Sequence, residues 1–197
     1  MELEQKFISY WSGLESLFSN YNPDENNFAR LSTIFPVCHK IWYLKRNLIE
    51  FDRDIKRLGV TNNISNFSNT DINYLSNDTV YNEIITNFKI DNPLLAFRAF
   101  SLKLIIEKEK DRMKILENHT QNLQWNIARA YRIRNEIIHD AVINSEIVHI
   151  TSHLKYYLLF ILNSLLDFLS TSPIDVNKDN KIDLDDFYTL QLIKSDN

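Results

Sequence analysis

Residues that make tight turns are scarce in this sequence, which has two glycines and four prolines among 197 residues. A sheet with many hairpins needs such residues, so their scarcity argues against that class of fold and favours long helices. Cysteine is scarcer still, because Cys38 is the only one. A single thiol excludes an intrachain disulfide framework and a cysteine-rich zinc site, and it suits a reducing compartment.

Long apolar runs are also missing. The longest, residues 156–162, is far too short to span a bilayer, and Asn163 and Asp167 prevent it from extending further. Residues 1–6 lack the basic and apolar regions of a signal peptide, so we expect a cytoplasmic protein with no membrane partner. The net charge of −4 gives no global attraction to nucleic acid, so any such contact needs a local basic patch.

Helical periodicity is what the sequence has in abundance. At the N-terminus, apolar residues recur every three or four positions and form one stripe: Leu3, Phe7, Tyr10, Trp11, Leu14, Leu17, Phe18 and Tyr21. Further helices are expected over about 26–58 with a jog near Pro36, to about 88 after a polar loop at 60–77, and over 91–118, 120–142, 145–170 and 184–193. We predict an all-α antiparallel bundle of five to six main helices in residues 1–171, followed by a C-terminal tail at 172–197.

One polar side chain interrupts the apolar face of the helix that holds the candidate site. At about 100° per residue, seven apolar residues fall within one arc: Leu123, Ile127, Ala130, Tyr131, Ile137, Ile138 and Ala141. Arg134 falls near the middle of that arc. A guanidinium is costly to bury alone, so Arg134 needs a carboxylate, a phosphate or a group of carbonyls. Asn135 and His139 share the flank of the arc, and Arg129 and Arg132 lie on the polar side.

This set of side chains suits RNA cleavage without a metal. A base must take the proton from the ribose 2′-OH, and the imidazole of His139 titrates in the right range. A fixed positive charge must offset the charge that develops on the phosphorane, and Arg134 offers two parallel hydrogen bonds. The amide of Asn135 can hold the phosphate or the imidazole in place. Attack by the 2′-OH would restrict the reaction to RNA and leave a cyclic phosphate end.

The same residues also have a purely structural interpretation. Arg134 can pair with a structural carboxylate from another helix. His139 can cap the carbonyls at the C-terminus of its helix and complement the helix dipole. The spacing of one arginine and one histidine does not by itself decide between the two interpretations.

Two segments resemble a known family. Residues 130–141, Ala-Tyr-Arg-Ile-Arg-Asn-Glu-Ile-Ile-His-Asp-Ala, resemble the signature of HEPN domains, and the closest likeness is to the Apea-like group. In that signature an arginine, a polar residue, three further residues and a histidine stand late in a helix. Residues 7–18, Phe-Ile-Ser-Tyr-Trp-Ser-Gly-Leu-Glu-Ser-Leu-Phe, resemble the aromatic-rich first helix of those domains. The two matches stand in the expected order, so the resemblance spans the chain to about residue 170.

The resemblance implies a helical bundle that forms a homodimer, with the two motifs facing each other in a composite active site. It implies a metal-independent endoribonuclease that requires no cofactor and cleaves RNA, tRNA included, in antiviral defence, abortive infection or a toxin system. Carried over residue by residue, Arg134 and His139 are catalytic and Asn135 is supporting. Glu15 either pairs with Arg134, or orients His139, or is simply solvated. Because they are basic and close to the motif, Arg129 and Arg132 are expected to bind the RNA backbone.

An alternative exists within the same superfamily. Some members are non-catalytic modules that drive dimerisation, or that bind nucleotide or RNA for a larger defence assembly. A regulatory partner, or a regulatory domain fused in a longer protein, is compatible with either role.

The C-terminal tail resembles the calcium loop of an EF-hand or a dockerin. The candidate ligands stand at the spacing of that loop: Asp175, Asn177, Asp179, Lys181 through its carbonyl, Asp183 and Asp186. Two positions depart from the pattern, because Asn180 replaces the usual glycine and Asp186 replaces the bidentate glutamate. The alternative is a polar tail, rich in Asp and Asn, that binds no metal.

Overall fold

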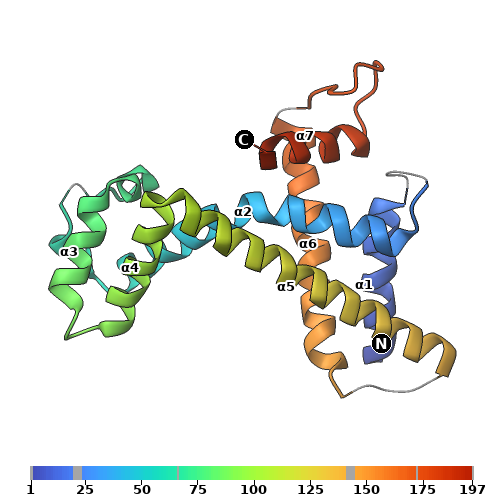
Figure 1. Ribbon diagram of the computed structural model, residues 1–197, viewed down its shortest axis with the longest axis horizontal. Helices are drawn as coiled ribbons and strands as arrows, with labels where there is room; N and C mark the ends of the chain where they lie inside the picture. The colour runs from blue at the N-terminus through green and yellow to red at the C-terminus, as the bar shows by residue number, and fades with distance from the viewer. Residues whose placement is uncertain (1, 20–23, 66, 141–144, 172, 197) are drawn as a thin grey trace. The chain divides into compact units, whose positions relative to one another are not determined.

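The computed structural model describes residues 2–19, 24–65, 67–140, 145–171 and 173–196. These residues form seven α-helices, two 3-10 helices and one π-helical turn, and they contain no strand (Figure 1). The predicted all-α fold class is therefore confirmed. Across the same ranges, no helix is both long and apolar enough to cross a membrane.

The chain divides into two compact units. Met1–Ile41 and Thr120–Asn197 form the first unit, and Trp42–His119 form the second. Helices α2 (Asn27–Arg57) and α5 (Glu109–Asn135) each contribute residues to both units. The division predicted from the sequence, with a boundary after residue 171, is a different one and stays a prediction.

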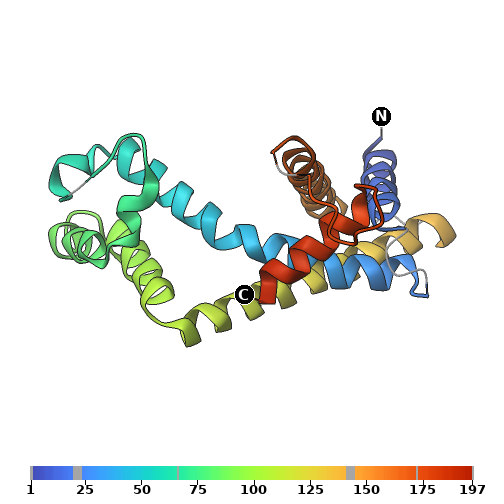
Figure 2. The same ribbon diagram turned by 90° about the horizontal axis from the view of Figure 1, so that it is seen from above.

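Two helices of the first unit, α1 (Leu3–Phe18) and α6 (Ile147–Thr171), lie side by side and run in the same direction (Figures 1 and 2). Their close approach depends on Gly13, because a Cβ at this position would lie 3.1 Å from Leu158 Cδ2. The pair crosses the segments of α2 and α5 that belong to the same unit (Figure 2). The first unit is therefore built from two layers of helices.

The apolar stripe of α1 is the centre of the first unit's core. Four of its residues are fully buried at helical spacing: Phe7, Trp11, Leu14 and Phe18. The C-terminal helix α7 (Leu184–Asp196) joins the same core. The Tyr188 hydroxyl donates to the Leu17 carbonyl over 2.7 Å, and the Tyr188 ring stacks on Phe18 with centroids 5.0 Å apart. The short terminal helix predicted from the sequence is thus present and packed.

Helix α2 continues through a proline in its interior. Pro36 has no N–H, so it cannot donate to the carbonyl of Ser32 as an α-helix requires. The side-chain amide of Gln124, on α5, lies 3.5 Å from that carbonyl oxygen and points a donor at it. The helical region predicted over about 26–58 is confirmed, because one helix spans Asn27–Arg57 with Pro36 inside it, and the predicted jog near Pro36 stays a prediction.

In the second unit, α3 (Asp78–Phe88) and α4 (Pro93–Glu107) begin at asparagine caps. Asn77 Oδ1 accepts from the Thr79 amide over 3.0 Å, and Asn92 Oδ1 accepts from the Leu95 amide over 3.1 Å. The predicted helix start at 91–93 is therefore confirmed. The polar stretch before α3 holds two short 3-10 helices, Val60–Asn63 and Ile72–Ser76.

One predicted helix boundary was wrong. The sequence suggested a break at about 118–120, but the break falls at Lys108, whose backbone is extended. His119 lies inside α5, where its ring stacks on Tyr43 with centroids 3.9 Å apart. No glycine or proline marks the true break, so the sequence carried no local signal for it.

Candidate functional site

The helix that carries the Arg-to-His motif ends in a π-helical turn. Glu136–Asp140 continue α5 with the wider i→i+5 pattern. In a regular α-helix, side chains five residues apart point about 140° from one another. A π-helical turn winds less per residue, so it rotates His139 toward the side of Arg134. The backbone thus brings the two motif positions nearer to one face than a regular helix would.

Aromatic packing holds the motif helix on the first unit. Ala130 and Ile133 are buried in the core. The Tyr131 ring stacks on Phe28, with centroids 4.6 Å apart, and lies 5.9 Å from the Trp11 ring of α1. The helix segment directly before the motif is therefore fixed by two other helices.

The apolar arc predicted on this helix is correct over its first part and wrong near its end. Leu123 and Ile127 are buried, whereas Ile138 is 48% exposed. The end of α5 extends past α1 in both views (Figures 1 and 2), which agrees with the exposure of Ile138. Ala141, the last member of the arc, lies outside the described residues.

Arg134 is half-buried, and its partner is the neighbouring side chain. Arg134 Nη1 donates to Asn135 Oδ1 over 3.0 Å. Among the described residues, no carboxylate lies within ion-pair distance of the Arg134 guanidinium. The structural interpretation proposed a carboxylate of another helix as the partner of Arg134, and the described residues do not supply one. A guanidinium has five N–H donors, so this arrangement leaves donors for an external anion.

His139 is exposed at the end of the motif, and Glu15 is half-buried on α1. Glu15 follows Trp11 by one helical turn, which places it one turn beyond the contact between α1 and Tyr131. Within the described part of the chain, Glu15 forms no hydrogen bond or ion pair with Arg134 or His139. The structure therefore brings together Arg134 and Asn135, but it does not join Glu15 to them.

Both arginines expected to bind RNA are paired with glutamates. Arg129 forms an ion pair with Glu146, which lies just before α6. Arg129 Nε also donates a hydrogen bond to the Glu146 carboxylate, and this hydrogen bond lowers the pKa of Glu146. Arg132 Nε lies 3.8 Å from a carboxylate oxygen of Glu136, and the Arg132 side chain is largely exposed. Sequence reasoning missed both glutamates. The four-residue spacing of Arg132 and Glu136 was a usable signal, whereas nothing local indicated Glu146.

The candidate calcium loop is folded around its own carboxylates. The two oxygens of Asp175 accept from the amides of Asp179 and Asn180, over 3.2 and 2.9 Å. Asp186 is buried, and it accepts from the amides of Val176, over 2.7 Å, and Asn177, over 3.0 Å. These hydrogen bonds lower the pKa of the Asp186 carboxyl.

The backbone at Asn180 and the charge of the acidic side chains both affect whether this loop can bind a cation. Asn180 takes the place of the usual glycine with a φ of 67°, in the left-handed region that asparagine tolerates. Burial, together with repulsion from Asp183, Asp186 and Asp179, raises the pKa of Asp185. Over the described residues, no three His, Cys, Asp or Glu side chains converge in an arrangement that could hold a metal ion. Asn180 thus has the left-handed backbone that the glycine of a calcium loop would have, and the carboxylates of Asp175 and Asp186 accept hydrogen bonds from backbone amides.

Comparisons with protein-family models, with curated proteins and with solved structures find no match for this chain.

Proposed function

We propose that this chain is a metal-independent endoribonuclease of the HEPN type, which cleaves RNA through attack of the ribose 2′-OH. The observation that supports this most is the state of Arg134. Its half-buried guanidinium bonds to the Asn135 amide and to no carboxylate of the described chain, so its charge is not neutralised within it. A scissile phosphate is an anion of the right shape for a guanidinium.

In the proposed reaction, His139 takes the proton from the 2′-OH as the 2′-oxygen attacks phosphorus. The bond to the 5′-oxygen breaks, and that oxygen leaves with a proton delivered by an acid. The products are a 2′,3′-cyclic phosphate and a 5′-hydroxyl. Arg134 stabilises the charge on the phosphorane, and Asn135 orients the guanidinium through the bond described above.

RNA can reach the two flanking arginines at modest cost. The pair of Arg132 with Glu136 is long and exposed, and the side chains of Arg129 and Glu146 are 40% and 39% exposed. Exposed ion pairs contribute little to stability, so phosphates can replace the glutamates. We therefore assign Arg129 and Arg132 to binding of the RNA backbone.

The proposal includes a homodimer. The exposed end of the motif helix, with Ile138 uncovered, is where a second copy would bring its own motif. The resemblance further suggests a cytoplasmic role in antiviral defence, abortive infection or a toxin system, with tRNA among the substrates. It also suggests control by a regulatory partner or a fused domain.

The test is incubation of the purified chain with total RNA and a tRNA pool in excess EDTA. Arg134→Ala and His139→Ala are compared with matched controls, Arg53→Ala and His153→Ala, which change exposed residues outside the motif. We expect cleavage by wild type and both controls, with cyclic phosphate ends, and none by the motif variants. Cleavage by all five proteins would show that the activity does not belong to this site.

The alternative, a non-catalytic module for dimerisation or for binding nucleotide or RNA, makes the opposite prediction. A folded dimer that binds RNA without cutting it would support this alternative. It would contradict the proposal that the chain is an active endoribonuclease without a partner.

We also propose weak calcium binding at the C-terminal loop. Two observations support it: the left-handed backbone of Asn180, and the hydrogen bond from the Asn180 amide that holds the Asp175 carboxylate in the loop. Calcium would have to compete with the amides that now bind Asp186, which predicts low affinity. Calorimetric titration tests it, and an absence of heat at millimolar calcium would reject it.

A further inference from the structure

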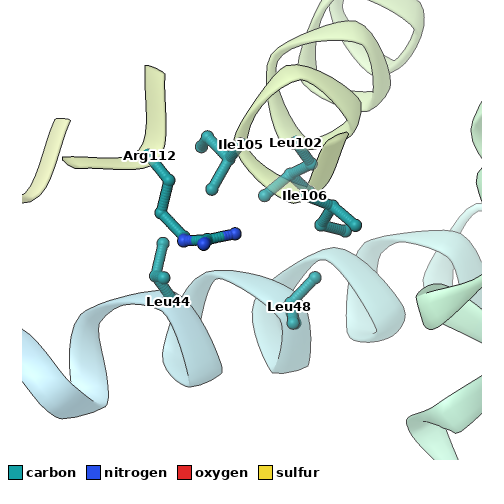
Figure 3. A pocket seen from close by; sticks show the side chains of 6 residues that line it. All are labelled: Leu44, Leu48, Leu102, Ile105, Ile106 and Arg112. Atoms are coloured by element: carbon teal, nitrogen blue, oxygen red, sulfur yellow. The ribbon is translucent and has the colours of Figure 1, made fainter. Parts of the chain in front are cut away.

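A pocket of about 200 Å³ lies within the second unit. It is lined by residues of α2, α4 and α5: Leu44, Leu48, Leu102, Ile105, Ile106 and Arg112. Figure 3 shows the Arg112 guanidinium extending among the aliphatic side chains. The pocket therefore combines an aliphatic lining with one permanent positive charge.

The charge of Arg112 is not satisfied within the unit. Its side chain is half-buried and forms no hydrogen bond or ion pair with any residue that the structure describes. Two other arginines of the unit differ from Arg112, because Arg46 pairs with Glu50 and Arg98 pairs with Asp54. An unpaired guanidinium beside leucine and isoleucine side chains is unfavourable, and an anion would relieve that cost.

We propose that this pocket binds a small aliphatic monocarboxylate, with its carboxylate on Arg112 and its tail among the leucines and isoleucines. The planar guanidinium can donate two parallel hydrogen bonds to a carboxylate. A volume of 200 Å³ holds about six or seven groups of methylene size, at roughly 30 Å³ for each water-sized group. The fitting ligand is therefore an unbranched acid of about six to eight carbons.

The aliphatic tail and the carboxylate of the ligand contribute separately to its affinity for the pocket, so each contribution can be measured by itself. Each methylene that leaves water should strengthen binding about fourfold until the pocket is full. Affinity should thus rise from butanoate to octanoate and then level off or fall at decanoate. A neutral alcohol with the same tail lacks the contact with Arg112 and should bind at least tenfold more weakly.

The experiment is calorimetric titration of the full chain with this acid series and with hexanol against hexanoate, below micelle-forming concentrations. Methyl resonances of Leu48, Leu102 and Ile106 should shift on binding, whereas methyls of the first unit should not. A concentration of about 10 mM is ample for the affinities that such contacts give. No octanoate binding at this concentration, or equal affinity for hexanoate and hexanol, would overturn the proposal.

Two variants make the test specific. Arg112→Gln keeps a polar side chain but removes the charge, and we expect it to weaken octanoate binding at least tenfold while hexanol binding is unchanged. Arg53→Gln removes a charge from an exposed position outside the pocket and should bind octanoate as wild type does. Circular dichroism establishes that both are folded. Equal loss in the two variants would show non-specific charge attraction and reject the site.

Discussion

Arg134 differs from an ordinary surface arginine in two respects: it is half-buried, and it bonds to an amide instead of a carboxylate. Changing it therefore leaves no carboxylate of the described chain unpaired. We expect Arg134→Ala and Arg134→Lys to keep the thermal stability of wild type within a few degrees. A structural arginine in a buried ion pair would behave otherwise, because its removal leaves an uncompensated charge.

The first prediction concerns the shape of that cation. Lysine keeps the charge of Arg134 but cannot form two parallel hydrogen bonds with a phosphate, so Arg134→Lys should lower the rate of RNA cleavage about 100-fold or more. Asn135→Ala should cause a smaller loss, because it removes the group that orients the guanidinium and keeps the guanidinium itself. Single-turnover rates on one tRNA measure both. An unchanged rate for Arg134→Lys would mean that Arg134 does not contact the phosphate.

The second prediction concerns two adjacent aspartates with opposite pKa shifts. Asp186 has a lowered pKa because backbone amides bind it, so it adds stability that is fully present above about pH 4, the unfolded value, and is lost as the pH falls through the folded value. Asp185 has a raised pKa because of burial and its acidic neighbours, so its ionised form reduces stability at neutral pH. At pH 7 in EDTA, Asp186→Asn should lower the Tm and Asp185→Asn should raise it.

Calorimetric scans from pH 3 to pH 7 measure the direction of both changes in Tm. The Tm difference between Asp185→Asn and wild type should shrink as the pH falls, since protonation of Asp185 removes the same charge. A lower Tm for Asp185→Asn at pH 7 would contradict this account of the loop.

Some residue properties could be predicted from the sequence and others could not. The half-buried position of Arg134 followed from the helical wheel, because the helix is regular up to that point. The exposure of Ile138 did not, since it depends on where the neighbouring helices end. The ion pair of Arg129 with Glu146 was equally hidden, because the two residues belong to different elements and meet only through the tertiary fold.

Among the helices, too, some boundaries could be predicted from the sequence and others could not. The start of α4 was predictable from the Asn92–Pro93 cap, which is local chemistry. The break at Lys108 and the π-helical turn at Glu136–Asp140 were not, since neither has a glycine or proline to mark it. The π-helical turn matters most for the site, because it sets the direction of His139 relative to Arg134.

The third prediction concerns the contact between α1 and α6. Gly13→Ala adds helix propensity but places a Cβ 3.1 Å from Leu158, whose half-buried side chain can shift, so the free energy of unfolding should change by less than about 1 kcal/mol. Gly13→Leu would force the helices apart and should cost about 1–3 kcal/mol.

Urea unfolding measures both variants against Ser12→Leu, which adds the same side chain at an exposed position of α1. If Gly13→Leu were as stable as Ser12→Leu, the close packing at Gly13 would not be a feature of the folded protein.

For the whole molecule, the all-α class followed from the sequence because periodicity and the scarcity of glycine and proline act along the entire chain. The division into two units did not, because α2 and α5 each contribute to both and no linker marks the boundary. The packing of α7 on the core through Tyr188 was likewise invisible, since it depends on a contact with Leu17 at the other end of the chain.

The fourth prediction is the oligomeric state. A homodimer should have a mass of twice 23.4 kDa, about 47 kDa, in light scattering. Ile138→Asp would place a charge on the uncovered end of the motif helix and should shift the mass toward the monomer, since an unpaired charge is costly to bury at an interface. Leu166→Asp, at another exposed apolar position, serves as the control. A monomeric wild type at all concentrations would contradict the composite site.

The most direct test of cleavage through the ribose 2′-OH uses one RNA oligonucleotide that contains a mapped cleavage site and a second that differs only by a 2′-deoxyribose at that site. Both are incubated with wild type and His139→Ala in excess EDTA. We predict that wild type cuts the first oligonucleotide and leaves a cyclic phosphate, that it leaves the second intact, and that His139→Ala cuts neither. Cleavage of the deoxy substrate, or equal cleavage by His139→Ala, would contradict this prediction.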